Sequence, residues 1–214
     1  MRTSTMASPR LTRALGIVAL TGAAVWVITI AAFHLIRPDL EPGNAYISNY
    51  ARGDWAWVMR LAFLVNAVGW AAAGEGLRRT VPGRAGRWLA VLAWLGSLGL
   101  AVAGVFRADP LGSSMVSTEG WLHSRAADLA FIALIAVGFV GWRAFRGADA
   151  WARWPHPSLA YGVTALVLLA IFLAWSATVG DGFGWWQRAL AGVVIPGWLA
   201  ALGVRLVTRS RVAK

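Results

Sequence analysis

Three side chains of the types that hydrolases use lie in the connections and helix starts of this sequence, namely Ser48, Asp109 and His123. A histidine beside a serine acts as its general base, and a carboxylate can orient that histidine. Asp109 and His123 are also metal-ligand candidates, because imidazole and carboxylate groups bind zinc. A third interpretation stays open, in which His123 is only a hydrogen-bonded residue of a helix interface.

Further polar residues in the same regions are candidates for a ligand-binding or polar site. They are His34, Tyr50, Arg60, Thr118, Arg125, Asp128 and Arg188. The i, i+3 spacing of Arg125 and Asp128 predicts an ion pair on one helix. Arg60 either faces neighbouring helices or extends to lipid headgroups. In a minor alternative, His34 and His123 on different helices ligate a haem; no cofactor is otherwise indicated.

Long apolar segments must position these side chains. The chain has 214 residues, of which 58% are hydrophobic and 14% charged, whereas a soluble domain has ~25% charged residues. Since about 20 apolar residues cross a membrane as a helix, we predict an all-α bundle of six transmembrane helices in one domain, residues 14–207, between an N-terminal tail (1–13) and a basic C-terminal tail (208–214). The predicted helices are 14–36, 55–77, 88–106, 122–142, 157–179 and 188–207.

The chain has no cysteine, so disulfides and thiolate metal sites are excluded.

The net charge of +11 is distributed unevenly. Fourteen of the twenty Lys and Arg residues fall in the N-terminal tail, in the second-to-third and fourth-to-fifth connections, and at the C-terminal end from Arg205 onwards. Seven of the nine acidic residues fall on the opposite side. The positive-inside rule therefore predicts a multi-pass protein of the plasma membrane with both termini in the cytoplasm. These short basic connections indicate topology and contact with lipid, so no nucleic-acid partner is expected.

Four local patterns resemble a known family. They are His34-Leu-Ile-Arg37-Pro-Asp39 leading into Ile47-Ser48-Asn49-Tyr50-Ala51-Arg52-Gly53, Gly104-Val-Phe106-Arg-Ala-Asp109-Pro110, Thr118-Glu-Gly120-Trp-Leu-His123, and Gly184-Trp-Trp-Gln187-Arg188. In this order the chain resembles the bacterial and archaeal family called domain of unknown function 998, from about Ala14 to Val207. The resemblance implies six membrane helices and no established activity. It includes the candidates Ser48, Tyr50, Asp109, Thr118, His123 and Arg188.

Two classes of function remain as hypotheses. The first is a non-catalytic, transporter-like or partner-binding bundle whose polar site faces outward and takes a lipid or small molecule at the outer leaflet. Small-residue spacings, such as Gly69 to Ala73 and Gly99 to Ala103, would serve helix packing or a homo-oligomer. The alternative is an intramembrane, lipid-directed hydrolase, metal-dependent or not, that uses Ser48, Asp109 and His123.

Overall fold

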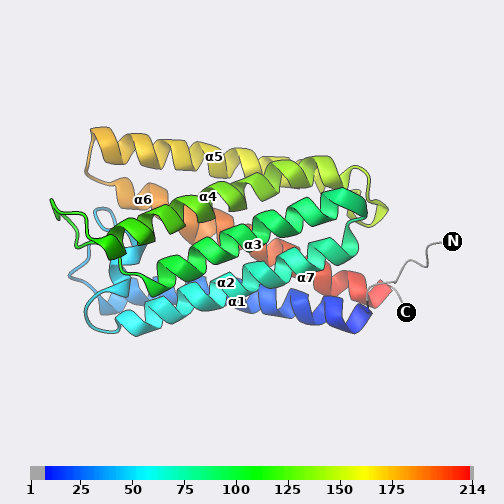
Figure 1. Ribbon diagram of the computed structural model, residues 1–214, viewed down its shortest axis with the longest axis horizontal. Helices are drawn as coiled ribbons and strands as arrows, with labels where there is room; N and C mark the ends of the chain where they lie inside the picture. Colours follow the sequence, from blue (N-terminus) through cyan, green and yellow to red (C-terminus); the bar gives the residue numbers. More distant parts are fainter. Residues whose placement is uncertain (1–7, 213–214) are drawn as a thin grey trace.

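The computed structural model describes residues 8–212, and side chains as far as residue 208. Its six long helical segments all run along the long axis of the molecule (Figure 1). They are α1 (Pro9–Ile36), α2 (Ala56–Thr80), α3 (Gly83–Val105), α4 (Thr118–Phe145), α5 (Pro155–Thr178), and a last segment composed of α6 (Phe183–Gln187), the π-helix η3 (Arg188–Val194) and α7 (Ile195–Val212). Two short 3₁₀ helices, η1 (Ile47–Ala51) and η2 (Asp149–Trp151), lie in connections.

Each long helix packs beside its neighbour in the sequence, and the last segment returns to pack against α1. The bundle is therefore a closed, up-and-down ring. At one end, which we call the long-loop end, lie the connections 37–55, 106–117 and 179–182; at the other, the terminal end, α1 begins and α7 ends (Figure 1).

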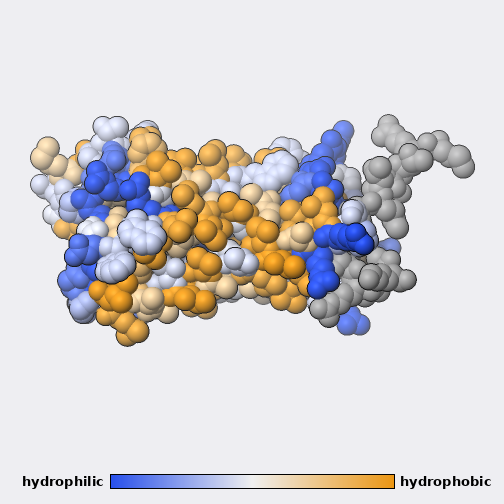
Figure 2. All heavy atoms as spheres, turned by 90° about the horizontal axis from the view of Figure 1, so that it is seen from below, coloured by the Kyte–Doolittle hydropathy of each residue, from blue (hydrophilic) through white to orange (hydrophobic). Residues whose placement is uncertain are grey.

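All six segments are long and apolar enough to cross a membrane. Figure 2 shows an apolar belt around the middle of the visible face and hydrophilic residues gathered towards the two ends. Large apolar side chains stay exposed on the helix faces, including Ile28, Val68, Ile132 and Val193. Such a surface suits lipid rather than water. These findings confirm the predicted all-α, six-helix membrane bundle, whereas the side of the membrane that each end faces stays a prediction.

The helices extend beyond the predicted apolar segments. α1 begins at Pro9, at the helix position where a missing N–H costs nothing, and so takes in part of the predicted N-terminal tail. α4 likewise runs from Thr118 to Phe145. Hydropathy locates the part of a helix that lipid contacts, while helical hydrogen bonding continues into the polar boundary. Residues 1–7 and 213–214 of the predicted tails lie outside the described residues.

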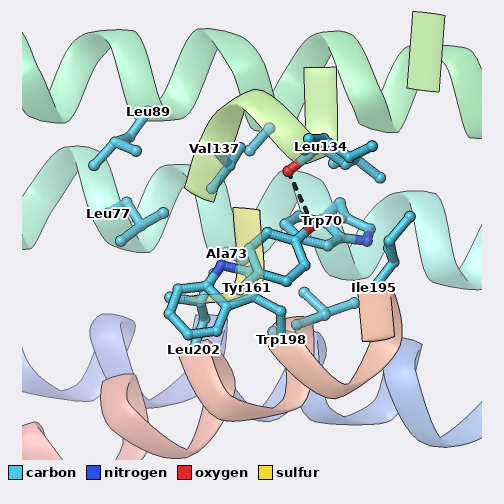
Figure 3. Close-up of a cluster of buried hydrophobic side chains, with 14 of the residues drawn as sticks. Trp70, Ala73, Leu77, Leu89, Leu134, Val137, Tyr161, Ile195, Trp198 and Leu202 are labelled. Atoms are coloured by element: carbon cyan, nitrogen blue, oxygen red, sulfur yellow. Dashed lines mark hydrogen bonds between the residues drawn. The ribbon is translucent and has the colours of Figure 1, made fainter. Parts of the chain in front are cut away.

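The bundle core combines stacked aromatic residues with very close helix approaches. Tyr161 stacks on Trp198 with ring centroids 5.0 Å apart, and its hydroxyl donates to the Leu134 carbonyl oxygen over 2.9 Å (Figure 3). Glycine pairs allow three helix contacts, because a Cβ atom on Gly22, Gly16 or Gly138 would lie within 3.0 Å of Gly69, Gly203 or Gly162 respectively. Small residues at such contacts let backbones meet. Of these six glycines, Gly69 belongs to one of the small-residue spacings noted in the sequence.

The last segment is not a regular α-helix. In η3 the Ile195 N–H bonds to the Leu190 carbonyl, five residues back. The next donor in this pattern would be residue 196, but Pro196 has no N–H. The carbonyl of Ala191 accepts a hydrogen bond from Nε1 of Trp26 on α1 instead, at 2.7 Å. The proline thus leaves a backbone acceptor that another helix satisfies.

Candidate ligand cavity at the long-loop end

The C-terminus of α3 is capped by side chains from both neighbouring helices. Carbonyl groups at a helix end have no partner within the helix. Arg60 of α2 donates to the carbonyls of Gly104 and Val105, at 3.1 and 2.6 Å. From α4, Nδ1 of His123 lies 2.9 Å from the Ala103 carbonyl oxygen and 3.0 Å from that of Phe106. Arg60 therefore faces the bundle, one of its two predicted placements.

This capping determines how His123 is oriented. Both neighbours of Nδ1 are carbonyl oxygens, which only accept, so in the neutral ring Nδ1 carries the proton and Nε2 has a free lone pair. His123 is only 6% exposed. It sits edge-on to the Phe63 ring, with centroids 6.2 Å apart, and lines a cavity. The ring thus presents a buried hydrogen-bond acceptor that α3 does not use.

The cavity lies inside the half of the bundle next to the long-loop end and has a volume of about 60 Å³. This is enough for several water molecules or a small organic group. Most of its wall is apolar, and four neutral polar residues line it from four elements: Ser48 of η1, Asn66 of α2, His123 of α4 and Gln187 of α6. None of its lining residues is an aspartate, glutamate, lysine or arginine.

Asn66 is the most informative residue of the cavity wall. It is 2% exposed, and its Oδ1 atom is fully buried without a hydrogen-bond partner among the described residues. A buried amide oxygen without a partner costs about 1–3 kcal/mol. Gln187 differs, since its Oε1 accepts from the Ile47 N–H at 2.7 Å. Asn66 therefore offers an acceptor that a ligand or water in the cavity could satisfy.

Arg188 joins the connection 37–55 to the first and last helices. It is 6% exposed. Its Nε donates to Nε2 of His34 at 2.9 Å, and its other nitrogens donate to the Ala45 and Gly184 carbonyls and to the Tyr50 hydroxyl. None of the ion pairs in the described part of the chain includes Arg188. The candidates His34, Tyr50 and Arg188 therefore form one cluster, in which Tyr50 and Arg188 are buried, His34 is partly buried, and the acceptors are neutral.

A second arginine, Arg37, makes hydrogen bonds within the same connection, 37–55. Arg37 binds both carboxylate oxygens of Asp39, at 2.7 and 2.8 Å, and donates to the Arg52 carbonyl. The hydrogen bond between the two side chains raises the pKa of Arg37 and lowers the pKa of Asp39. Burial raises the pKa of Tyr46 in the same connection. At neutral pH, Arg37 and Asp39 are therefore charged and Tyr46 is neutral.

The structure separates Asp109 from the other two hydrolase candidates. Its carboxylate accepts hydrogen bonds from the N–H of Ser117 and, at 2.6 Å, from the Ser117 hydroxyl. Ser117 in turn caps the start of α4 by accepting from the Gly120 N–H. Ser48 and His123 share the cavity, but Asp109 does not line it. Asp109 thus orders the α3–α4 connection.

The remaining candidates lie apart from the cavity. Arg125 and Asp128 form the predicted ion pair, at 3.0 Å and largely exposed, and Thr118 is exposed at the first turn of α4. No cluster of three His, Cys, Asp or Glu residues able to hold a metal ion occurs among residues 8–212. For His34 and His123, the pair considered as haem ligands, one ring nitrogen of each is already hydrogen-bonded within the protein.

Three wall residues with a hydrogen-bonding side-chain group, Asn66, Gln187 and Trp26, were not among the sequence candidates. Asn66 is the one carboxamide inside the six apolar segments and Gln187 directly precedes the last of them, so a search for amides at membrane depth would have found both. Trp26 had no such signal, because fourteen tryptophans occur in the chain. Its importance depends on Pro196, far away in the sequence.

The fold and its surface define the class, a multi-pass helical membrane protein with an internal cavity at one end. The chain belongs to the family described as "Protein of unknown function (DUF998)", whose model matches residues 20–205. This confirms the resemblance seen in the sequence motifs. No curated protein and no solved structure matches the chain.

Proposed function

We propose that this protein is a non-catalytic, transporter-like or partner-binding membrane protein that holds a small uncharged ligand in the cavity between Ser48, Asn66, His123 and Gln187. The observation that carries the proposal is Asn66, which lines the cavity of about 60 Å³ and has a buried Oδ1 atom without a hydrogen-bond partner among the described residues. Charged ligands are disfavoured, since a wall without charged side chains would have to desolvate them uncompensated.

The wall also indicates the ligand's functional groups. His123 Nε2 and Asn66 Oδ1 are both acceptors to which no described residue donates, so we expect the ligand to donate at least one hydrogen bond. The apolar remainder of the wall favours a hydrocarbon part. An aliphatic alcohol, or a lipid with a free hydroxyl group, has this combination.

Photolabelling with an aliphatic alcohol that carries a diazirine group tests the proposal. We expect adducts on α4 between His123 and Phe131, and about three- to tenfold less labelling in Asn66→Leu, the effect of one lost hydrogen bond. The matched control is Ser158→Ala, which removes a buried hydroxyl bonded to the Gly138 carbonyl elsewhere in the bundle. Equal labelling of wild type and Asn66→Leu, or adducts only on lipid-facing residues, would contradict the proposal.

The hydrolase alternative has one observation in its favour. Ser48 and His123 line the same cavity, and the Nε2 atom of His123 is the basic one. Against it, the two acceptors at Nδ1 are carbonyls rather than a carboxylate, so the group that stabilises a charged histidine in such enzymes is missing from this position. Labelling of Ser48 by a fluorophosphonate, lost in His123→Gln, would establish the hydrolase and overturn the non-catalytic proposal.

A further inference from the structure

A basic groove lies at the terminal end of the bundle, far from the cavity. It has a volume of about 830 Å³ and runs between the start of α3 and the end of α4. Its charged residues are Arg84, Arg143 and Arg146, all exposed. Trp88, Phe139 and Val140 are among its apolar wall residues.

The three arginines lack acidic partners. None takes part in an ion pair within the described residues, and no carboxylate lines the groove. Arg146 lies over the Trp142 ring, with its guanidinium carbon 4.3 Å from the centroid. Three like charges around one groove repel one another unless an anion lies between them.

Helix electrostatics explains only part of this arrangement. Arg143 and Arg146 stand at the end of α4, where cations interact favourably with the helix dipole. Arg84 stands in the first turn of α3, where a cation is unfavourable and no acidic residue is present. The helix dipole therefore does not account for the position of Arg84.

The residues around the groove are typical of a membrane surface. Trp88 is 62% exposed, as tryptophans are at headgroup level, and the groove continues onto the partly exposed Phe139 and Val140 of a membrane-spanning helix. We propose that this groove binds the phosphate of an anionic phospholipid between Arg84, Arg143 and Arg146, with an acyl chain along Phe139 and Val140. Guanidinium groups bind phosphate oxygens in pairs, and basic pockets between membrane helices suit such headgroups.

A single introduced cysteine tests this, because the chain has none of its own. Gly147 lines the groove, and a Cβ atom there meets nothing within 4 Å. The variant Gly147→Cys is labelled with bimane and reconstituted in bilayers. Quenching of the bimane fluorescence is then compared between brominated phosphatidylglycerol and brominated phosphatidylcholine. We expect quenching by the anionic lipid at concentrations at least about fivefold lower, given the contribution of each arginine near a charged surface.

Two triple variants separate a site from general surface charge. Arg84→Gln/Arg143→Gln/Arg146→Gln should abolish the preference for the anionic lipid. Arg10→Gln/Arg13→Gln/Arg153→Gln removes the same charge from exposed positions at the same end and should keep it. An equal loss in both variants, or no preference in the wild type, would overturn the proposal.

Two further arms complete the test. If the triple glutamine variant does not fold, Arg84→Gln alone should lower the preference about fivefold, and an unchanged preference would count against the site. Inorganic phosphate, compared with chloride at equal ionic strength, should not relieve the quenching. Relief by millimolar phosphate would identify a site for the free anion and overturn the assignment to a lipid.

Discussion

Nε of Arg188 donates a hydrogen bond to Nε2 of His34 over 2.9 Å, joining two residues that are 154 positions apart in the sequence. The contact fixes the end of α1 to the start of η3. Because the same guanidinium also binds Tyr50 and the carbonyls of Ala45 and Gly184, the connection 37–55 is held by one buried cation.

We expect Arg188→Met to lower the free energy of unfolding by about 2–4 kcal/mol, because several buried acceptors lose a charged donor together. Unfolding by SDS in mixed micelles measures this. The control is Arg125→Met, whose exposed ion pair should change the same quantity by less than about 1 kcal/mol. Similar values for the two variants would refute the bridging role of Arg188.

Trp26 and Pro196 should be energetically coupled. Trp26→Phe leaves the Ala191 carbonyl without the indole donor, at a cost of about 1–3 kcal/mol. In that background Pro196→Ala supplies a backbone N–H, so the double variant should recover part of the loss. A double-mutant cycle on unfolding free energies measures the coupling; additive effects would contradict our account of η3.

The contact between α4 and α5 should be intolerant of one added methyl group. A Cβ atom on Gly138 would lie 2.6 Å from Cα of Gly162, which is backbone and cannot rotate away. We expect Gly138→Ala to cost about 1–3 kcal/mol of unfolding free energy. Gly197→Ala is the matched control, since nothing lies within 4 Å of a Cβ there, and it should leave stability equal or about 1 kcal/mol higher.

Asp109 should prove dispensable for the cavity. Asp109→Asn keeps one acceptor oxygen for Ser117, so we expect a loss of up to about 1 kcal/mol of stability and unchanged photolabelling by the diazirine alcohol. Quantitative mass spectrometry of the labelled α4 peptides measures the extent of photolabelling. A large drop in labelling, with Asp128→Asn unchanged, would return Asp109 to the cavity site.

The orientation in the membrane can be measured with the same cysteine-free background. The charge asymmetry predicts the long-loop end outside and the terminal end in the cytoplasm. A membrane-impermeant maleimide should therefore label Ser114→Cys on intact cells and label Gly147→Cys only after the cells are opened. The reverse pattern would show that the positive-inside prediction is wrong for this chain.

By itself, the sequence determined the number and class of the helices, because six stretches of about 20 apolar residues have no other stable form in lipid. It also determined short-range pairs, such as Arg125 with Asp128, since helical spacing fixes which neighbours meet. The family motifs include Ser48, Tyr50, His123 and Arg188, and the structure places all four towards the long-loop end.

Only the tertiary structure decided which of those side chains meet. Ser48 and His123 share a cavity with Asn66, while Asp109 turns to Ser117 and Arg188 to His34. Asp109 and Ser117 share one connection, but the other partners lie on different elements. Their distances depend on how the ring of helices closes and on the wider turn of η3 before Pro196. Hydropathy is insensitive to both, because helix rotation and backbone hydrogen-bond pattern leave the apolar composition of a segment unchanged.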